Sequence, residues 1–321
     1  MYIRGLLATA ALATLPAVAS AQGVTMASTV TLGFSFGSVG GIPGADIDLN
    51  TTSLDFASDI MFGTNFGVGL DFGISQTAVD IAGAPFGIDL DLIGLAIEPV
   101  YYFGNGAYAG LYYRMGDLDL SISAIPITFG VDTRSFGVFG GYESGPLWIE
   151  GYVGSSDTDP GLPGAIDVMD YGLYASYDVM PNLEVFGGIA RTDIDAPGLG
   201  IDLTMYSIGA DYDFGNGLGV YGSVDRIDIG TPIPISIDAT AFTLGLDYDL
   251  GQSGAGVPVN LNLEFSRSTL DLGPLASLDV DRIALGVTIP IGGGSSQPLN
   301  SNTRAARGDY RSVIAAIANS F

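Results

Sequence analysis

The sequence contains no cysteine and no histidine, and its basic residues are all arginines because lysine is missing as well. Without cysteine there is neither a disulfide framework nor a lipid-anchor site, so stability has to come from backbone pairing and burial. Without histidine the chain lacks the side chain that most often transfers protons near neutral pH, which argues against an enzyme. We therefore expect no catalytic residue and no cofactor.

Long apolar runs are also missing beyond residue 21. Hydrophobic residues make up 47% of the sequence and charged residues only 14%. Even so, no later segment reaches the roughly 18 consecutive apolar residues of a membrane-spanning helix. A chain this apolar without such a helix is either a protein with a large buried core or a transmembrane β-barrel.

Positive charge is scarce. The chain has 10 basic residues against 35 acidic ones, and its net charge is −25. This balance argues against nucleic acid as a partner, because phosphate backbones are bound by clustered basic side chains. Clustered Asp-x-Asp pairs could hold calcium through their oxygens, but none has the spacing of a calcium-binding loop, so we expect no metal site.

The first residues have the layout of a secretory signal. Arg4 precedes an apolar run over residues 5–18, and residues 19–21 are small. This layout is typical of a cleaved signal peptide, here residues 1–21. We expect the mature chain to begin near Gln22, outside the cytoplasm.

A short phrase returns seven times along the chain, with Asp alternating with Ile, Leu or Val beside an apolar tip that contains Gly or Pro. Plainer turns, such as residues 104–106, lie between these Asp-flanked tips. Two kinds of connection in alternation predict about fourteen strands, with 12 to 16 as the range. The predicted strands are 24–40, 46–62, 66–81, 88–103, 107–122, 127–143, 147–158, 166–179, 183–195, 201–214, 218–230, 235–250, 257–272 and 278–291.

The period-two pattern is clear over residues 66–75, where large apolar side chains alternate with Gly, Asp and Ser. A soluble β-sandwich usually carries Lys, Glu and Thr on its polar face, whereas this polar face carries Gly, Ser and Ala. Because Gly is unfavourable inside strands unless space is needed, the small face indicates the inside of a closed barrel. Small lumen residues also favour an open pore.

Aromatic residues gather beside the plain turns. They are Phe62, Phe66, Tyr101, Tyr102, Phe103, Tyr108, Tyr142, Trp148, Tyr177, Phe186, Tyr212, Phe214, Tyr221 and Tyr248. Aromatic rings prefer the membrane interface, so these turns mark one rim of the bilayer. With a secreted amino end, the plain turns are predicted to face the periplasm and the Asp-flanked tips the cell exterior.

In these features, residues 24–291 resemble the Gram-negative outer-membrane β-barrels of the porin-like superfamily, in a minimal short-loop form. We predict an all-β fold, a closed antiparallel up-and-down transmembrane β-barrel over residues 22–294. The resemblance implies a place in the outer membrane. The implied partners are outer-membrane lipid, the barrel-assembly machinery and small solutes or cations. A monomer and a homo-oligomer both stay open.

Residues 295–321 form a predicted periplasmic tail. Three arginines, Arg304, Arg307 and Arg311, are the only basic cluster of the mature chain. Apolar residues fall on one helical face, namely Tyr310, Val313, Ile314, Ile317 and Phe321. Three states stay open: an amphipathic helix that plugs the acidic lumen from below, one that lies on the membrane, or a disordered tail.

The polar face changes parity within the strands that descend from the Asp-flanked tips. Asp202 is even, for example, whereas Ser207 and Asp211 are odd. A strand keeps both sets inside only if a residue is inserted, so we predict β-bulges in this zone. The alternative is that the outer aspartates face outward beyond the lipid, in water.

With bulges, a ring of charges lines the outer half of the lumen. The predicted pore-lining acidic residues are Asp89, Asp91, Asp117, Asp119, Asp132, Asp193, Asp195, Asp202, Asp228, Asp238, Asp279 and Asp281. The predicted pore-lining basic residues are Arg114, Arg134, Arg191, Arg226, Arg267 and Arg282. Such a ring is either a filter that favours cations or a set of cross-strand pairs that hold the register.

The predicted function is passive diffusion of small hydrophilic solutes through an outer-membrane channel that favours cations. The alternatives are a transporter of a hydrophobic substrate and a structural or adhesive barrel. Large polar outer loops, which an adhesin would need, are missing from the sequence.

Overall fold

The structure is a computed structural model that describes residues 23–320 except 43, 45, 85, 123–126, 160–166, 197–198, 232–236, 253–257 and 274–275. The predicted signal peptide, residues 1–21, lies outside the described residues. So do Phe321 and parts of several Asp-flanked tips.

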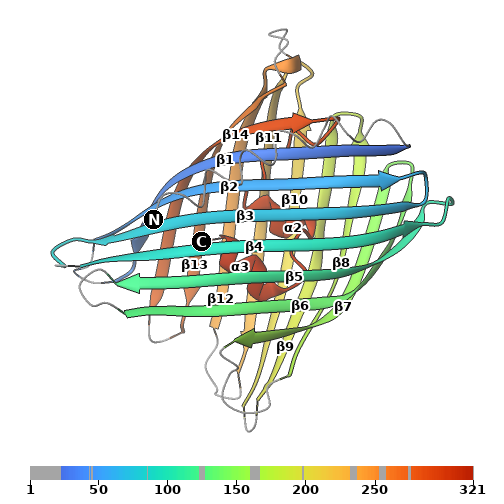
Figure 1. The fold of residues 1–321 in the computed structure, drawn as a ribbon. Helices are drawn as coiled ribbons and strands as arrows, with labels where there is room; N and C mark the ends of the chain where they lie inside the picture. Colours follow the sequence, from blue (N-terminus) through green and yellow to red (C-terminus); the bar gives the residue numbers. More distant parts are fainter. Residues whose placement is uncertain are drawn as a thin grey trace.

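The described residues form fourteen antiparallel strands that close into one barrel (Figure 1). The strands are β1 Val24–Gly40, β2 Ile47–Phe62, β3 Phe66–Ile81, β4 Gly87–Tyr102, β5 Ala107–Ile122, β6 Ile127–Ser144, β7 Leu147–Asp159, β8 Asp167–Met180, β9 Leu183–Ala196, β10 Leu199–Asp213, β11 Leu218–Gly230, β12 Ile237–Asp249, β13 Asn260–Asp271 and β14 Ser277–Ile291. Each strand pairs with its neighbours in sequence, and β1 pairs with β14. The predicted fold and strand number are confirmed.

Burial identifies the inner face of the wall. Thr31 of β1 lies opposite Thr288 of β14; both are at most 1% exposed, and their hydroxyls are 2.9 Å apart. The alternate residues of β1, Leu32 and Phe34, are exposed on the other face. Because paired residues share a face, this parity can be followed from strand to strand around the barrel. Closure leaves no unpaired edge, as spanning a membrane requires.

The aromatic side chains beside the plain turns divide between the two faces. Those on the outer face form a band at this end of the wall: Phe62, Phe66, Tyr101, Tyr142, Tyr177, Tyr212 and Tyr248. Those on the inner face are Tyr102, Tyr108, Trp148, Phe186 and Tyr221. Only the first group has the placement that an interfacial girdle requires.

The inward rings explain the many inward glycines. A Cβ on Gly137 would lie 2.6 Å from the Tyr112 ring, and one on Gly172 would lie 2.5 Å from the Tyr152 ring. Each ring therefore lies over the backbone of a glycine on the next strand. The inward glycines thus leave room for large side chains and not only for open space.

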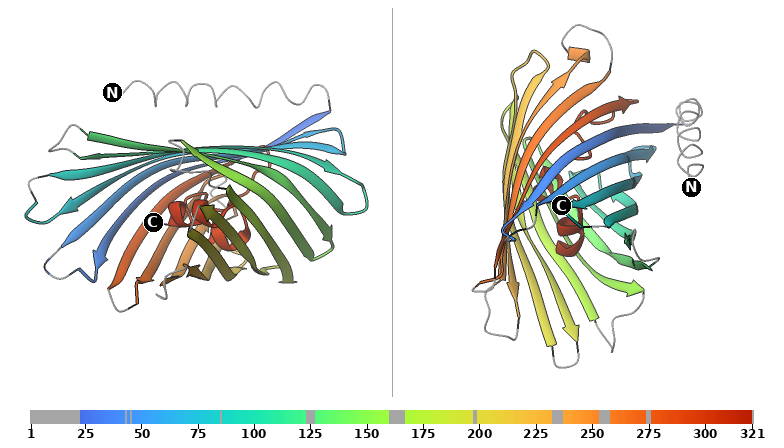
Figure 2. Two further views of the ribbon diagram at one scale, coloured as in Figure 1. Left: turned by 90° about the horizontal axis from the view of Figure 1, so that it is seen from below. Right: turned by 90° about the vertical axis from the view of Figure 1, so that its left-hand side faces the viewer.

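Two short helices, α2 (Thr303–Arg307) and α3 (Val313–Ser320), follow the last strand. They lie inside the barrel in both views of Figure 2. Ala306 and Val313 are completely buried there. No helix within the described ranges is long and apolar enough to cross a membrane.

The ring-over-glycine packing predicts that Gly188→Ala destabilises the barrel. A Cβ at Gly188 would collide with the buried ring of Tyr174 and with the Leu173 carbonyl. We expect the free energy of unfolding to fall by about 1–3 kcal/mol, the usual cost of overpacking. Denaturant unfolding in detergent micelles measures it. Gly94→Ala is the matched control, because nothing lies within 4 Å of a Cβ there. Equal stability of both variants would contradict the packing argument.

Candidate functional site in the barrel lumen

The predicted bulges are wrong. Pairing runs without a register shift through the zone where the polar face changes parity, as in the pairs of Asp202 with Asp193 and of Ser207 with Gly188. Among the described strands, the one register shift lies between Asp178 and Met180, beside a plain turn. The alternation of the strands is therefore unbroken below the Asp-flanked tips.

Unbroken alternation places all of the predicted acidic residues on the outer face of the wall. They are Asp89, Asp91, Asp117, Asp119, Asp132, Asp193, Asp195, Asp202, Asp228, Asp238, Asp279 and Asp281. Arg134, Arg191, Arg226 and Arg267 lie on the same face. Carboxylates are tolerated there because strands of this length extend beyond the apolar band into water.

The outer charges pair with one another at the surface. Arg226 contacts Asp228 at 2.8 Å, and Arg267 contacts Asp279 at 3.0 Å. All four side chains are well exposed, so each pair contributes little to stability. Arg267 and Asp279 lie on neighbouring strands, as the second interpretation of the sequence pattern requires, whereas Arg226 and Asp228 lie on the same strand.

Two predicted basic residues do face the lumen. Arg114 contacts Glu98 at 2.7 Å. Arg282 donates a hydrogen bond to the side-chain oxygen of Asn302 at 2.6 Å. The structure thus brings these two arginines inside and leaves the other predicted charges outside.

A different set of carboxylates lines the lumen, mostly in the half nearer the plain turns, which we call the inner half. It comprises Asp55, Asp59, Asp71, Glu98, Glu143, Glu150, Asp170, Asp178, Glu184, Asp211, Asp213, Asp225, Asp247, Asp249 and Glu264. The sequence carries the signal for them, because they share parity with the glycines and serines of the same strands. The bulge hypothesis placed the pore-lining carboxylates at the opposite end of the lumen.

Aliphatic side chains line the outer half of the lumen, toward the Asp-flanked tips. They include Val39, Leu49, Val79, Leu90, Leu92, Leu118, Leu120, Val131, Ile229, Leu270, Leu278 and Val280. They are the residues that alternate with the outward aspartates. The lumen is therefore polar and acidic in its inner half and apolar in its outer half.

The carboxy-terminal segment occupies the acidic half, and its arginines hold it there. Arg311 is 6% exposed and contacts Glu98 at 3.0 Å as well as Glu150. Its guanidinium lies 4.6 Å from the centre of the Phe139 ring. Burial alone lowers the pKa of Arg311, but Glu98 and Glu150 outweigh burial and raise it, so this side chain stays charged.

Arg307 makes a second contact of the same kind. It reaches Glu184 at 2.6 Å and Asp211 at 3.2 Å, and it lies 3.9 Å from the centre of the Phe186 ring. Arg304 contacts Asp71 at 2.5 Å. Its second partner, Asp309 at 2.7 Å, belongs to the segment itself.

Hydrogen bonds that do not involve arginine also hold the segment in the lumen. The backbone N–H of Val313 donates to the Thr192 hydroxyl at 3.0 Å, and that hydroxyl donates to Asp170 at 2.6 Å. A carboxylate at the amino end of α3 is favoured by the helix dipole. Glu264 accepts from the Ser301 hydroxyl and from a backbone N–H of the segment. Of the three states that the sequence left open, the structure has the helical plug.

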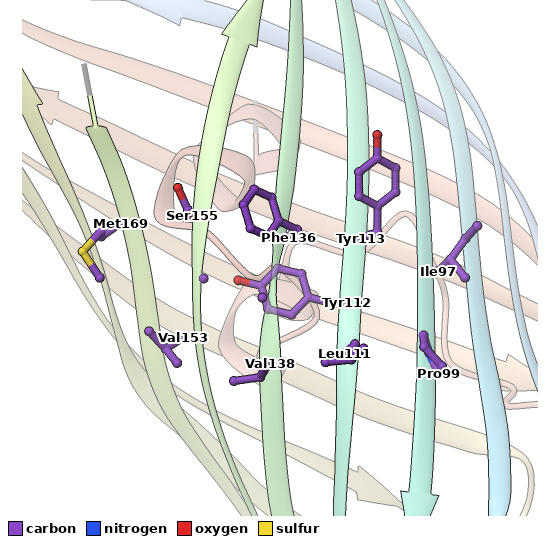
Figure 3. Close-up of a pocket in the computed structure, with 12 residues that line it drawn as sticks. Ile97, Pro99, Leu111, Tyr112, Tyr113, Phe136, Val138, Val153, Ser155 and Met169 are labelled. Carbon is purple, nitrogen blue, oxygen red and sulfur yellow. The ribbon is translucent and has the colours of Figure 1, made fainter. Parts of the chain in front are cut away.

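Two of the spaces bordered by the described residues differ in position and lining. One of about 500 Å³ lies at the plain-turn end of the lumen, with Asp59, Asp247 and Arg307 among its lining residues. The other, a groove of about 700 Å³, is apolar and is lined by residues such as Phe136 and Val153 (Figure 3). Both of these side chains belong to the outer face, so the groove is part of the lipid-facing wall. No group of His, Cys, Asp or Glu suited to a metal ion occurs in the described part of the chain.

Comparison with known proteins extends these observations. A family model for Gram-negative porins matches residues 62–232 and, in an overlapping match, 102–271. A sequence search of curated proteins gives no match.

Two solved structures have a similar fold. The first is the anion-selective porin from Comamonas acidovorans, with 14% identity, a TM-score of 0.51 and coverage of 84% of this chain and 99% of that one. The second is the CymD monoaromatic hydrocarbon channel, with 10% identity, a TM-score of 0.52 and coverage of 85% and 90%. At such identities the likeness concerns the fold.

The contacts of Arg307 predict that Arg307→Gln loosens the carboxy-terminal segment. Without the guanidinium, Glu184 and Asp211 face each other unneutralised across β9 and β10. Because breaking a largely buried pair costs more than breaking an exposed one, we expect amide hydrogen exchange over residues 303–318 to speed up about tenfold or more. Arg226→Gln, which removes an exposed outer pair, is the control and should change this exchange by less than about twofold. Unchanged protection in Arg307→Gln would contradict the role of Arg307 in holding the segment.

Proposed function

Because this chain belongs to the family of Gram-negative porins and forms an outer-membrane channel, we propose that it passes small hydrophilic solutes, favours cations and is closed by its own carboxy-terminal segment. The excess of inward carboxylates over inward arginines in the inner half carries this proposal. We take the plain turns as the periplasmic end, which puts the plug on the periplasmic side. The barrel-assembly machinery stays an expected partner, and the oligomeric state stays open.

Fixed charge in the lumen supports a preference for cations. With the segment in place, Arg304, Arg307 and Arg311 neutralise part of the acidic lining. With the segment displaced, the inward carboxylates face only Arg114 and Arg282 among the described wall residues. Rings of fixed charge in a narrow path select the opposite sign and raise its local concentration. The selectivity of the Comamonas porin does not transfer, because selectivity depends on lining charges and not on the fold.

The outer carboxylates have a smaller part in this proposal. The wall separates them from the path, and bulk water and salt screen them over about 8 Å at physiological ionic strength. They contribute a negative field around the outer mouth, not a filter. The predicted cation preference thus rests on different residues from those that the sequence suggested.

Planar-bilayer recording under a salt gradient tests the proposal. We expect low conductance from the full chain, and larger conductance with a cation-selective reversal potential after deletion of residues 295–321. Truncation can prevent assembly for reasons unrelated to closure. The full-length variant Arg304→Gln/Arg307→Gln/Arg311→Gln therefore serves as a second opened form, and it should also conduct.

The outer charges supply the matched control for selectivity. Asp91→Asn/Asp119→Asn removes two outward carboxylates that face each other across β4 and β5, and it should leave the reversal potential unchanged. Absence of conductance in every form would rule out the channel with a removable closure. Anion preference of the opened barrel would rule out the role of the inward carboxylates.

A second candidate is transport of nonpolar solutes, and the aliphatic lining of the outer half favours it. The CymD channel, whose fold is similar, is described as a monoaromatic hydrocarbon channel. A nonpolar solute would gain about 25 cal/mol for each Å² of apolar surface that such a lining removes from water.

The second candidate predicts that Leu90→Asn/Leu92→Asn slows uptake of a small aromatic hydrocarbon by proteoliposomes. Both leucines face the lumen, so the variant makes this part of the apolar lining polar. Leu95→Asn is the control, because Leu95 lies on the outer face of the same strand. If the first variant takes up the hydrocarbon as fast as the native protein, the candidate is wrong.

A further inference from the structure

We propose that the inner half of the lumen contains two guanidinium-binding subsites, and that the carboxy-terminal segment occupies them as an internal mimic of a guanidinium-bearing solute. The first subsite consists of Glu98, Glu150 and Phe139. The second consists of Glu184, Asp211 and Phe186. The inference rests on the proposed channel function and adds to it the chemical class of the solute.

The first subsite is built so that the barrel itself orients both carboxylates. One oxygen of Glu98 accepts from Arg114 at 2.7 Å, and its other oxygen contacts Arg311 at 3.0 Å. One oxygen of Glu150 accepts from the Tyr108 hydroxyl at 2.9 Å, and its other oxygen contacts Arg311. Each carboxylate thus has one oxygen fixed by the wall and one presented to the guest.

An aromatic floor completes the first subsite. The Arg311 guanidinium lies 4.6 Å from the ring centre of Phe139 and 5.7 Å from that of Tyr152. A planar cation within about 6 Å of a ring centre is attracted by the ring quadrupole, more strongly when water is excluded. Phe139 and Tyr152 oppose each other on β6 and β7, so the wall positions this floor without help from the segment.

The second subsite needs a cation because its two carboxylates lie directly opposite each other. Glu184 and Asp211 are partners across β9 and β10, and like charges placed directly opposite destabilise a sheet. Arg307 resolves the conflict, because one nitrogen contacts Glu184 at 2.6 Å and another contacts Asp211 at 3.2 Å. Its guanidinium lies 3.9 Å from the centre of the Phe186 ring.

The shape of both subsites favours guanidinium over ammonium. Two nitrogens of one planar group reach two separate carboxylates while the same plane lies against a ring. An ammonium is a compact charge that lacks the flat face and the fixed fork. Arg304 marks no third subsite, because one of its two carboxylate partners is Asp309 of the segment itself.

In this arrangement the solute and the carboxy-terminal segment compete for the same subsites, so solute binding favours opening. A guanidinium-bearing solute can occupy a subsite only after the corresponding arginine leaves it. The segment is tethered, so its effective concentration at the subsites is in the millimolar range. Free solute therefore has to reach millimolar concentrations to displace it.

The full chain tests the inference through hydrogen exchange. Arginine amide and lysine amide carry the same charge, so they serve as the two probes. We expect millimolar arginine amide to speed up amide exchange over residues 303–318 about tenfold more than lysine amide does. Equal effects of the two probes, or no effect of either, would overturn the inference.

Calorimetry provides a second measurement that does not depend on conductance. In the full-length variant Arg307→Ala/Arg311→Ala the two subsites lose their internal guests. We expect arginine amide to bind this variant about tenfold more tightly than lysine amide. Adding Glu184→Gln should reduce that preference, whereas adding Asp91→Asn on the outer face should not.

The outcomes separate this inference from the channel proposal. If the opened barrel conducts with cation preference but binds both probes equally, the subsites are wrong and the channel stands. If it binds arginine amide selectively but no form conducts, the subsites stand and the channel with a removable closure is wrong.

Discussion

The alternation of side chains along unbroken strands is the constraint on which the rest of this structure depends. No residue is inserted between the Asp-flanked tips and the parity change. Whether a side chain faces the lumen or the outside of the barrel therefore depends only on whether its residue number is odd or even within its strand. Residues of one parity form the outer face, with apolar side chains at the level of the lipid and aspartates beyond it. The other carries carboxylates and glycines in the inner half and aliphatic residues in the outer half.

The acidic inner half creates a second requirement, which is charge compensation. Carboxylates such as Glu184 and Asp211 face each other across neighbouring strands and are partly buried. Without cations such a lining repels itself. Three arginines of the carboxy-terminal segment supply the cations, and the buried Ala306 and Val313 add apolar packing around them. The segment therefore fills the lumen and neutralises part of its wall at the same time.

The glycines link packing to this site. Gly172 and Gly188 leave room for the rings of Tyr152 and Tyr174 over the neighbouring backbone. Tyr152 then lies 5.7 Å from the Arg311 guanidinium, while Gly308 of the segment packs on the Tyr174 ring. The glycines of the wall thus leave room for inward aromatic side chains. These rings line the lumen and contact the segment.

Local pattern by itself determined the barrel, because period-two alternation, two kinds of turn and a missing spanning helix are properties of neighbouring residues. It also marked Arg304, Arg307 and Arg311 as a basic cluster. Only the tertiary structure decided that Asp91 and Asp279 lie on the outer face of the wall, because the face depends on a register that continues around the whole closed sheet. It also decided where the segment lies, because Glu98 and Glu150 become partners of Arg311 only when distant strands enclose it.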